Sequence, residues 1–199
     1  MKQTIFVNDN IKLRDALDGD AKEYVEIPFD EELLKMYGSE MSVNKGKSLD
    51  KAMTLVNEIK ANPYEWAIEY KGKFIGQVRL TIDNENNKAK FAIGIFNPQY
   101  WNKGIGTKVS NAILNFGFYE LKLHRIYLKV LAYNKRAIKS YENVGFKVEG
   151  EEREGAYING KYETDTHMGV LKANISNQTY SYTFIHFSMQ YRMNVRTIY

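Results

Sequence analysis

Short runs in which apolar and polar residues alternate recur along the chain, and each predicts a β-strand with one buried face. Some of these runs are separated by segments whose apolar residues have helical spacing. After residue 104, for example, Ile105, Val109 and Ile113 fall on one face of a predicted helix. The pairs Lys71-Gly72 and Asn159-Gly160 are typical of hairpin turns. The predicted strands are residues 11–14, 65–70, 74–82, 88–96, 124–132, 146–151 and 162–171.

The order of these elements predicts the fold class. Three consecutive strands between residues 65 and 96 form an antiparallel meander, after which helices and strands alternate. We therefore expect one layered α/β (α+β) domain, with a mixed, mostly antiparallel sheet of six to seven strands and helices on both faces. No repeat, Pro-rich linker or low-complexity tract divides this part of the chain.

Charged residues become rare near the C-terminus. Residues 173–199 contain no Asp, Glu or Lys, and their only charged side chains at neutral pH are Arg192 and Arg196. The chain is therefore divided into a domain at residues 1–172 and an aromatic extension at residues 173–199, to which the sequence assigns no role. Polar and aromatic residues alternate at 180–187, which is the composition of an extra strand.

Composition excludes several classes of protein. The chain has 199 residues, enough for one domain with a sizeable core, and it has no Cys, which removes a disulfide scaffold, a thiolate metal site and a cysteine nucleophile. Its net charge of +4 is too small to indicate nucleic acid. No apolar stretch is long enough for a signal peptide or a bilayer span, so we expect a cytoplasmic protein with neither a nucleic-acid nor a membrane partner.

The strongest chemical feature is the segment Tyr-Trp-Asn-Lys-Gly-Ile-Gly-Thr at residues 100–107, between a predicted strand and a long predicted helix. Gly104 and Gly106 let backbone N–H groups converge where the helix dipole adds positive potential, which suits a pyrophosphate. The spacing fits neither a Walker A loop nor a dinucleotide fingerprint, whose third glycine is replaced by Val109. A plain strand-to-helix turn explains this segment equally well.

A second segment, at residues 134–146, begins where a predicted strand ends. Tyr141 follows Asn134 by two helical turns, so the two side chains share one face of a helix. Asn134 offers amide hydrogen bonds, and Tyr141 offers a phenol proton. Taken singly, a helix cap at Asn134 and an ordinary packing role for Tyr141 are the simpler interpretations.

Together the two segments resemble the GNAT superfamily of N-acetyltransferases. The resemblance extends from about residue 11 to residue 172. It is greatest to the branch of ribosomal-protein alanine acetyltransferases and related small-amine acetyltransferases. It implies a sheet splayed between its fourth and fifth strands, with acetyl-CoA in the resulting cleft. The residues that carry it are 101–107, Asn134, Ala137, Tyr141, Gly145 and Phe146.

The resemblance also implies roles for individual residues. The pyrophosphate of acetyl-CoA would lie on the backbone of residues 102–107, and the pantetheine arm would follow residues 93–96. Tyr141 would be the catalytic acid, and the amide near Ile95 would stabilise the oxyanion. Trp101 departs from the family pattern, which usually has Arg or Gln there. No metal is implied. The expected cofactor-binding residues are Ile95, Phe96, Asn102, Lys103, Gly104, Ile105, Gly106, Thr107 and Asn134.

The predicted function is transfer of the acetyl group from acetyl-CoA to a primary amine by direct attack. A protein N-terminus, a polyamine and an amino sugar are all compatible substrates. Acids in the first helices are candidates for a lip that attracts a cationic amine, although a solvated helix face is the simpler interpretation. The alternative function is a CoA-binding sensor or scaffold with weak catalysis, and the resemblance also implies a homodimer. The acids concerned are Glu23, Glu26, Asp30, Glu31 and Glu32.

No general base is assigned. Ala92 and Lys129 occupy the positions where family members often carry an acid, and neither accepts a proton as that role requires. Thr164 also stands where related sequences tend to have an acid. The remaining candidates are a water chain to Asp83 or Glu85, the histidines His124 and His167, and the acids Glu163 and Asp165.

Overall fold

The computed structural model describes residues 2–38 and 47–175, so residues 176–199 of the predicted extension lie outside the described part of the chain. Within it, no helix is long and apolar enough to cross a membrane. The strands are β1 (Ile5–Asn8), β2 (Ile11–Arg14), β3 (Glu65–Tyr70), β4 (Lys73–Asp83), β5 (Lys88–Ile95), β6 (Arg125–Leu131), β7 (Lys147–Ile158) and β8 (Lys161–Leu171). The helices are α1 (Asp18–Glu26), α2 (Glu31–Tyr37), α3 (Leu49–Ala61), α4 (Ile105–Asn115) and α5 (Lys135–Glu142), with a π-helical turn (Phe116–Glu120) after α4 and 3-10 turns at Pro98–Tyr100 and Lys172–Asn174.

The strands form one sheet in the order β1-β2-β3-β4-β5-β6-β8-β7, in which only the β5–β6 pair is parallel. The predicted α/β class and the mostly antiparallel sheet are therefore confirmed. The sheet has eight strands rather than six or seven, because β1 folds back on β2. The Asn8 side chain accepts hydrogen bonds from the N–H groups of Asn10 and Ile11 and so closes a tight turn.

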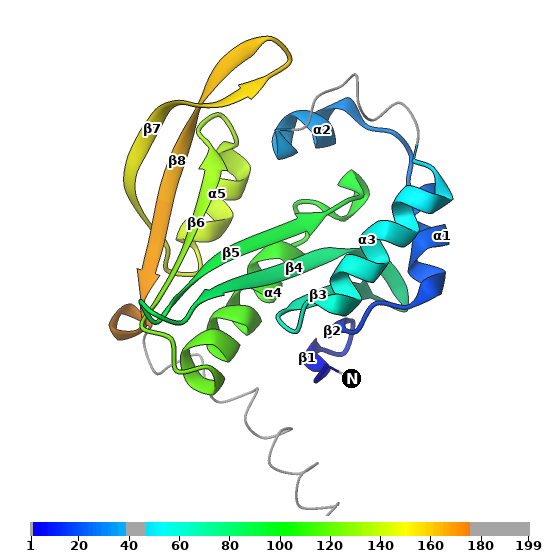
Figure 1. Cartoon of the computed structure of the whole chain (residues 1–199), viewed down its shortest axis with the longest axis horizontal. Coiled ribbons are helices and arrows are strands. Elements are labelled where there is room, and N and C mark those ends of the chain that lie inside the picture. The colour runs from blue at the N-terminus through cyan, green and yellow to red at the C-terminus, as the bar shows by residue number, and fades with distance from the viewer. Residues whose placement is uncertain (1, 39–46, 176–199) are drawn as a thin grey trace, which may run out of the picture.

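The sheet parts between β5 and β6, and Figure 1 shows these two strands diverging from one end. They share only three register pairs, which join residues 88–90 to residues 125–127. Counted from residue 11, these are the fourth and fifth predicted strands, so the splay lies where the resemblance implies. Beyond residue 90, backbone groups on this edge of β5 have no β6 partner and face the opening.

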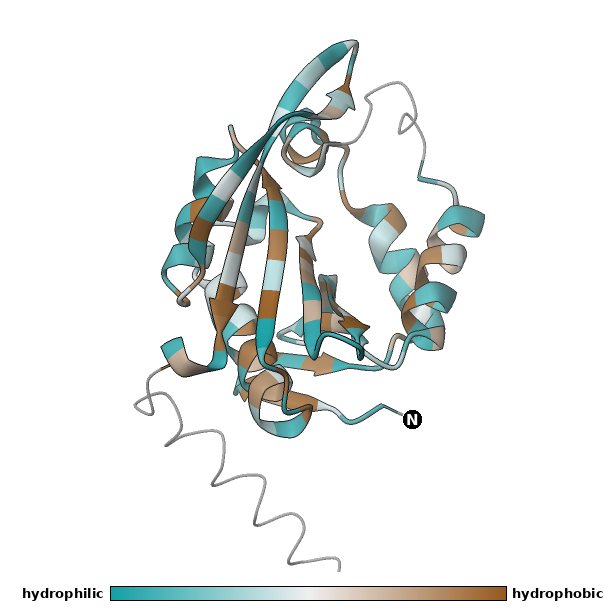
Figure 2. Cartoon of the chain, turned by 60° about the vertical axis from the view of Figure 1, so that its left-hand side comes forward, coloured by the Kyte–Doolittle hydropathy of each residue, from teal (hydrophilic) through white to brown (hydrophobic). Residues whose placement is uncertain are grey.

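Helices cover both faces of the sheet. Successive side chains of β3 point to opposite faces of the sheet, so this strand contributes to two hydrophobic cores. Trp66 and Ile68 pack into the core on the α4 side, whereas Ala67 packs with α1 and α3 on the opposite face. The α4 stripe predicted from the sequence is buried as expected, since Val109 and Ile113 are fully covered. The outermost strand, β7, is largely hydrophilic (Figure 2) and exposed along most of its length.

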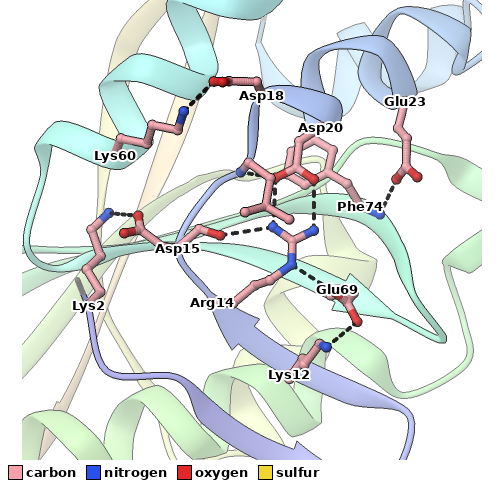
Figure 3. A network of polar contacts seen from close by, with 11 residues as sticks. Lys2, Lys12, Arg14, Asp15, Asp18, Asp20, Glu23, Lys60, Glu69 and Phe74 are labelled. Atoms are coloured by element: carbon pink, nitrogen blue, oxygen red, sulfur yellow. Dashed lines mark hydrogen bonds and ion pairs between the residues drawn. The ribbon is translucent and has the colours of Figure 1, made fainter.

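A buried ion-pair network fixes α1 to the sheet (Figure 3). Both terminal nitrogens of Arg14 on β2 donate to the Asp20 carboxylate at 2.8 Å, and its Nε donates to Glu69 on β3 at 2.6 Å. Asp20 also accepts from the N–H of Leu17, the N-cap of α1, so its carboxylate reaches back to the start of the helix. Removing one partner of such a buried pair typically costs about 3–5 kcal/mol.

Glu69 makes this network pH-dependent. Burial acts to raise its pKa, but hydrogen bonds from Lys12 and Arg14 outweigh burial and hold the pKa below the usual range. A carboxyl whose pKa is lower in the folded than in the unfolded state stabilises the fold above the unfolded pKa, about 4.3 for Glu. That stabilisation is lost as the pH falls through the folded value.

Candidate active site

The space between β5 and β6 is a cleft with a volume of about 780 Å³, within the range of small-molecule sites. Its floor and walls come from the diverging strands, the N-terminal ends of α4 and α5, the C-terminal end of α2 and the β7–β8 hairpin. Segments far apart in sequence therefore meet at the point where the sheet opens.

The glycine turn forms one wall of this cleft. Gly104 is the residue before α4 and has a left-handed backbone with φ of 69°, which L-residues with side chains adopt only at a cost. A Cβ added to Gly104 would have no neighbour within 4 Å, so the side of the turn that it would occupy is open. The first N–H groups of a helix have no partner inside the helix. At α4 these groups and the helix dipole provide an anion-binding point on the cleft wall.

Trp101 holds the glycine turn against β5. Its indole Nε1 donates to the carbonyl of Ile95 at 3.0 Å, and the guanidinium carbon of Arg136 lies 3.4 Å from the centroid of its ring. The indole therefore connects the turn, β5 and the start of α5. This explains how the turn keeps its position although Trp replaces the Arg or Gln of the family pattern.

Asn134 is the N-cap of α5, as the sequence predicted: its Oδ1 accepts from the N–H of Ala137 at 3.1 Å. Its Nδ2 also donates to the carbonyl of Met36 at 3.2 Å, which ties α5 to the end of α2. Thr107 and Ser140 form a hydroxyl–hydroxyl contact at 3.1 Å between α4 and α5. The two helices that frame the anion-binding point are thus fixed to each other.

Tyr141 lines the cleft inside an aromatic wall. Its ring makes edge contacts with Phe91 at 6.1 Å and Phe146 at 5.8 Å between centroids. Burial raises the pKa of the Tyr141 phenol to about 12, with the positive charge of Arg136 acting in the opposite direction. The phenol therefore keeps its proton at physiological pH and is a hydrogen-bond donor.

Alternation of hydrogen bonding along β5 turns the Ile95 amide toward the cleft. The N–H of Phe96 donates to Ile75 on β4 at 2.9 Å, and Gly94 is in register with Gln77 of the same strand. In an antiparallel pair, adjacent residues direct their N–H groups to opposite sides. The N–H of Ile95 consequently points away from β4, on the side from which the Ile95 carbonyl accepts the Trp101 indole.

The charges around the cleft are strongly asymmetric. Among the described residues, its only carboxylate is Asp165 of β8. The surplus of cations suits a ligand with several negative charges, such as phosphates. Five cationic side chains line it: Arg79, Lys90, Lys129, Arg136 and Lys139.

Eight of the predicted site residues line the cleft, and two do not. The ring of Phe96 packs against Tyr24 and Phe74 outside it, and its N–H is already bonded to β4. Lys103 is exposed, with its Nζ 5.7 Å from the centroid of the Tyr100 ring. The eight that line the cleft are Ile95, Asn102, Gly104, Ile105, Gly106, Thr107, Asn134 and Tyr141.

The positions where an acid was expected are also in the cleft. Ala92 and Lys129 both line it, and the Lys129 ammonium is paired with Glu152 of β7, which also contacts His167. Two acids of the expected lip have structural roles instead. Glu23 accepts from the N–H of Phe74 at 2.6 Å, and Asp30 caps α2.

Sequence reasoning did not single out Tyr37 or Arg136, both of which line the cleft. Arg136 had a local signal, since it follows the Asn134 cap by two residues and so lies in the first turn of α5. Tyr37 had none, because its position depends on how α2 packs across the cleft.

Solved structures share this fold. A crystal structure of a GNAT-family acetyltransferase from Bacillus anthracis aligns with a TM-score of 0.72 at 19% identity, covering 86% of this chain and 99% of that one. A family model described as an acetyltransferase (GNAT) domain matches residues 10–147. The chain therefore belongs to the GNAT acetyltransferase family, and the resemblance drawn from the glycine turn and the Asn134–Tyr141 face is confirmed.

Several relatives carry names that state a substrate. Spermidine N(1)-acetyltransferase of Escherichia coli K12 is 34% identical over 108 residues, or 54% of this chain and 58% of that protein. YdaF of Bacillus subtilis, which bears the name "Putative ribosomal N-acetyltransferase", is 30% identical over 112 residues, 56% of this chain and 61% of that protein. Each of these two alignments therefore spans less than two thirds of the relative's length. Spermidine N-acetyltransferase from Vibrio cholerae, solved with CoA and spermine, aligns with a TM-score of 0.68 at 28% identity, covering 84% and 98%.

Proposed function

We propose that this protein is an acetyl-CoA-dependent N-acetyltransferase that acts on a primary amine. The observation that carries the proposal is the convergence, in one cleft, of the α4 N-terminus, the N–H of Ile95, which points away from β4, and the protonated phenol of Tyr141. An anion-binding point for the cofactor, a hydrogen-bond donor for the oxyanion and a hydrogen-bond donor for the departing sulfur are groups that suit acyl transfer from a thioester.

Acetyl-CoA supplies the acetyl group as an activated thioester when it is bound. The N-terminal backbone of α4 is the proposed seat of its pyrophosphate, and Arg136 and Lys139 lie close enough to the cleft to neutralise phosphate charge. The open side of Gly104 supports this placement, because no protein atom fills the space. The edge of β5 left unpaired by the splay is the proposed track of the pantetheine arm.

The proposed chemistry is one displacement. The neutral amine nitrogen bonds to the acetyl carbon, the carbon–sulfur bond breaks, the amine loses a proton and the thiolate is protonated. The N–H of Ile95 stabilises negative charge that develops on the acetyl oxygen; donors of this kind contribute about 3–4 kcal/mol in other enzymes. The Tyr141 phenol donates a hydrogen bond to the departing sulfur as negative charge develops there.

Asp165 is the proposed contact for the amine. Gly94 and Leu131 each lie six residues beyond the first parallel pair, Lys88 with Arg125, so they stand at similar heights across the splay. Asp165 is the β8 partner of Leu131 and lines the cleft. A carboxylate at the height of the Ile95 amide attracts an ammonium to the position of attack in an otherwise cationic cleft.

The amine class is the finer part of the proposal. The relatives named for spermidine and for a ribosomal substrate favour a polyamine or a protein N-terminus as the first amines to test. A homodimer and a cytoplasmic location, which the absence of Cys fits, belong to the same proposal.

The test is to incubate the protein with acetyl-CoA and a panel of polyamines, N-terminal peptides and amino sugars while free thiol is monitored. Thiol release that depends on one amine class, with the acetylated amine identified by mass spectrometry, is the expected result. Binding of CoA without turnover of any amine would favour the alternative, a CoA-binding sensor or scaffold.

A further inference from the structure

The short helix α2 spans the open end of the cleft. On the β6 side, the Tyr133 hydroxyl donates to the carbonyl of Lys35 at 2.6 Å, and the Asn134 amide donates to that of Met36. Gly38 ends the helix close to Leu131 and Ile158, whose methyl groups lie 3.1 Å from the position of an added Cβ. Figure 1 shows α2 between the β7–β8 hairpin and the end of β5.

On the β5 side, Tyr37 extends from α2 to the strand. Its hydroxyl oxygen lies 2.7 Å from where a Cβ on Gly94 would stand, so the absence of a side chain at Gly94 leaves the space that the phenol fills. The Tyr37 ring is 6.3 Å from that of Phe96. The residue as a whole is 42% exposed, whereas its hydroxyl is buried.

The Tyr37 hydroxyl also meets the amide expected to stabilise the oxyanion. Burial raises the pKa of Tyr37, and a backbone hydrogen bond from Ile95 acts in the opposite direction. A hydrogen bond that lowers a phenol pKa is donated to its oxygen, so the N–H of Ile95 is the donor. That N–H already points into the cleft, away from β4.

We propose that Tyr37 is a residue of the acyl site, whose hydroxyl and the carbonyl oxygen of a bound acetyl group compete for the N–H of Ile95. This inference rests on the proposed function. The acetyl group of acetyl-CoA must displace the Tyr37 hydroxyl, whereas free CoA has no carbonyl at that point and leaves it in place. Tyr37 thus reduces the preference for acetyl-CoA over CoA and restores the resting contact once the acetyl group has left.

The test compares the dissociation constants of acetyl-CoA and CoA for the wild-type protein and Tyr37→Phe by calorimetry. Removing the competing hydroxyl should tighten acetyl-CoA binding roughly two- to tenfold, the worth of one hydrogen bond, and leave CoA binding unchanged. Tyr24→Phe is the matched control, because Tyr24 also packs against Phe96 but does not line the cleft, and it should change neither constant.

A second measurement needs no ligand. Hydrogen exchange of the Ile95 amide should be faster in Tyr37→Phe than in the wild type, since its acceptor is gone, and unchanged in Tyr24→Phe. If the wild-type protein binds both ligands and Tyr37→Phe has the same ratio of dissociation constants for acetyl-CoA and CoA, the role of Tyr37 is overturned while the proposed function stays intact. Failure of the wild-type protein to bind either ligand would overturn both, and an unchanged Ile95 exchange rate would contradict the contact itself.

Discussion

Tyr141 illustrates how environment sets the role of a single side chain. A phenol with a pKa of about 12 lies roughly 3.5 pKa units above an ordinary thiol, so complete proton transfer to a thiolate is uphill by about 5 kcal/mol. We therefore propose that the phenol donates a hydrogen bond to the sulfur as negative charge develops there, rather than transferring its proton. Such charged hydrogen bonds contribute about 1.5–3 kcal/mol.

Tyr141→Phe should therefore lower kcat roughly ten- to hundredfold, with little change in the affinity for CoA. Because the protonated phenol is the active form and its pKa is about 12, the wild-type rate should show no alkaline decline from Tyr141 below about pH 11. The rate should instead rise toward the pKa of the amine, near 10 for an alkylamine, in both proteins. Steady-state rates between pH 6 and 10 check this, and an unchanged kcat would remove Tyr141 from the chemistry.

Asp165 provides the second prediction at this scale. Asp165→Asn keeps the shape of the side chain but removes the only carboxylate found among the described lining residues, so KM for the amine should rise roughly five- to tenfold. KM for acetyl-CoA should stay the same. Glu163→Gln is the control, since it removes the same charge from β8 outside the cleft lining. Equal effects of the two variants would show that Asp165 has no special contact with the amine.

Residues whose roles are local were predictable from the sequence. The Asn134 cap and the helix that begins after Gly104 follow from short-range rules and are confirmed. The contacts of Trp101 and Tyr37 were not predictable, because each depends on which distant backbone group the side chain meets. The indole of Trp101 meets the Ile95 carbonyl, and the Tyr37 phenol meets the Ile95 amide.

At the scale of elements, long periodic segments were predictable and short ones were not. The meander β3–β5 and helix α4 match their predicted positions, because each has many positions that keep one period. The four residues of β1 have too few positions to establish alternation, and their pairing depends on the turn at Asn8. The role of α2 depends on contacts with β5, β6 and α5, which its own seven residues do not encode.

The turn before α4 gives a prediction about an element. Gly104→Val should raise KM for acetyl-CoA at least tenfold, because the side chain would fill the open space assigned to the pyrophosphate. It should also lower the free energy of unfolding by about 1–2 kcal/mol, since φ is 69°. Thermal melts and steady-state kinetics measure the two effects separately.

Gly72→Val separates the two contributions. Gly72 lies in the β3–β4 turn, has φ of 79° and would likewise place its Cβ in open space, so the backbone penalty should be similar. It is remote from the cleft lining, and KM for acetyl-CoA should not change. An unchanged KM in Gly104→Val, or an equal rise in both variants, would contradict the placement of the cofactor.

At the scale of the whole molecule, the sheet is weakly paired at the cleft, where β5 and β6 diverge. Only three register pairs join β5 to β6, whereas the neighbouring pairs of strands share longer ladders. Helices also join the two halves, among them α4 on one face of the sheet and α2 at the opening. A ligand that fills about 780 Å³ between them adds contacts to both halves at once.

Acetyl-CoA should consequently stabilise the protein most where the sheet is open. At a free concentration one hundred times Kd, binding to the folded state alone adds about 2.7 kcal/mol to the free energy of unfolding, which corresponds to a rise in Tm of roughly 5–10 °C. Amides of β5 beyond residue 90 and of β6 beyond residue 127 should gain the most protection from hydrogen exchange, because they flank the cleft without pairing to each other. Amides around the Arg14–Asp20 pair should gain only the protection that follows from the higher free energy of unfolding of the whole protein, since this pair already fixes α1 to the far side of the sheet.

Gly104→Val should reduce the Tm shift at the same ligand concentration, whereas Gly72→Val should preserve it. A shift with no added protection along β5 and β6 would place the ligand elsewhere on the molecule.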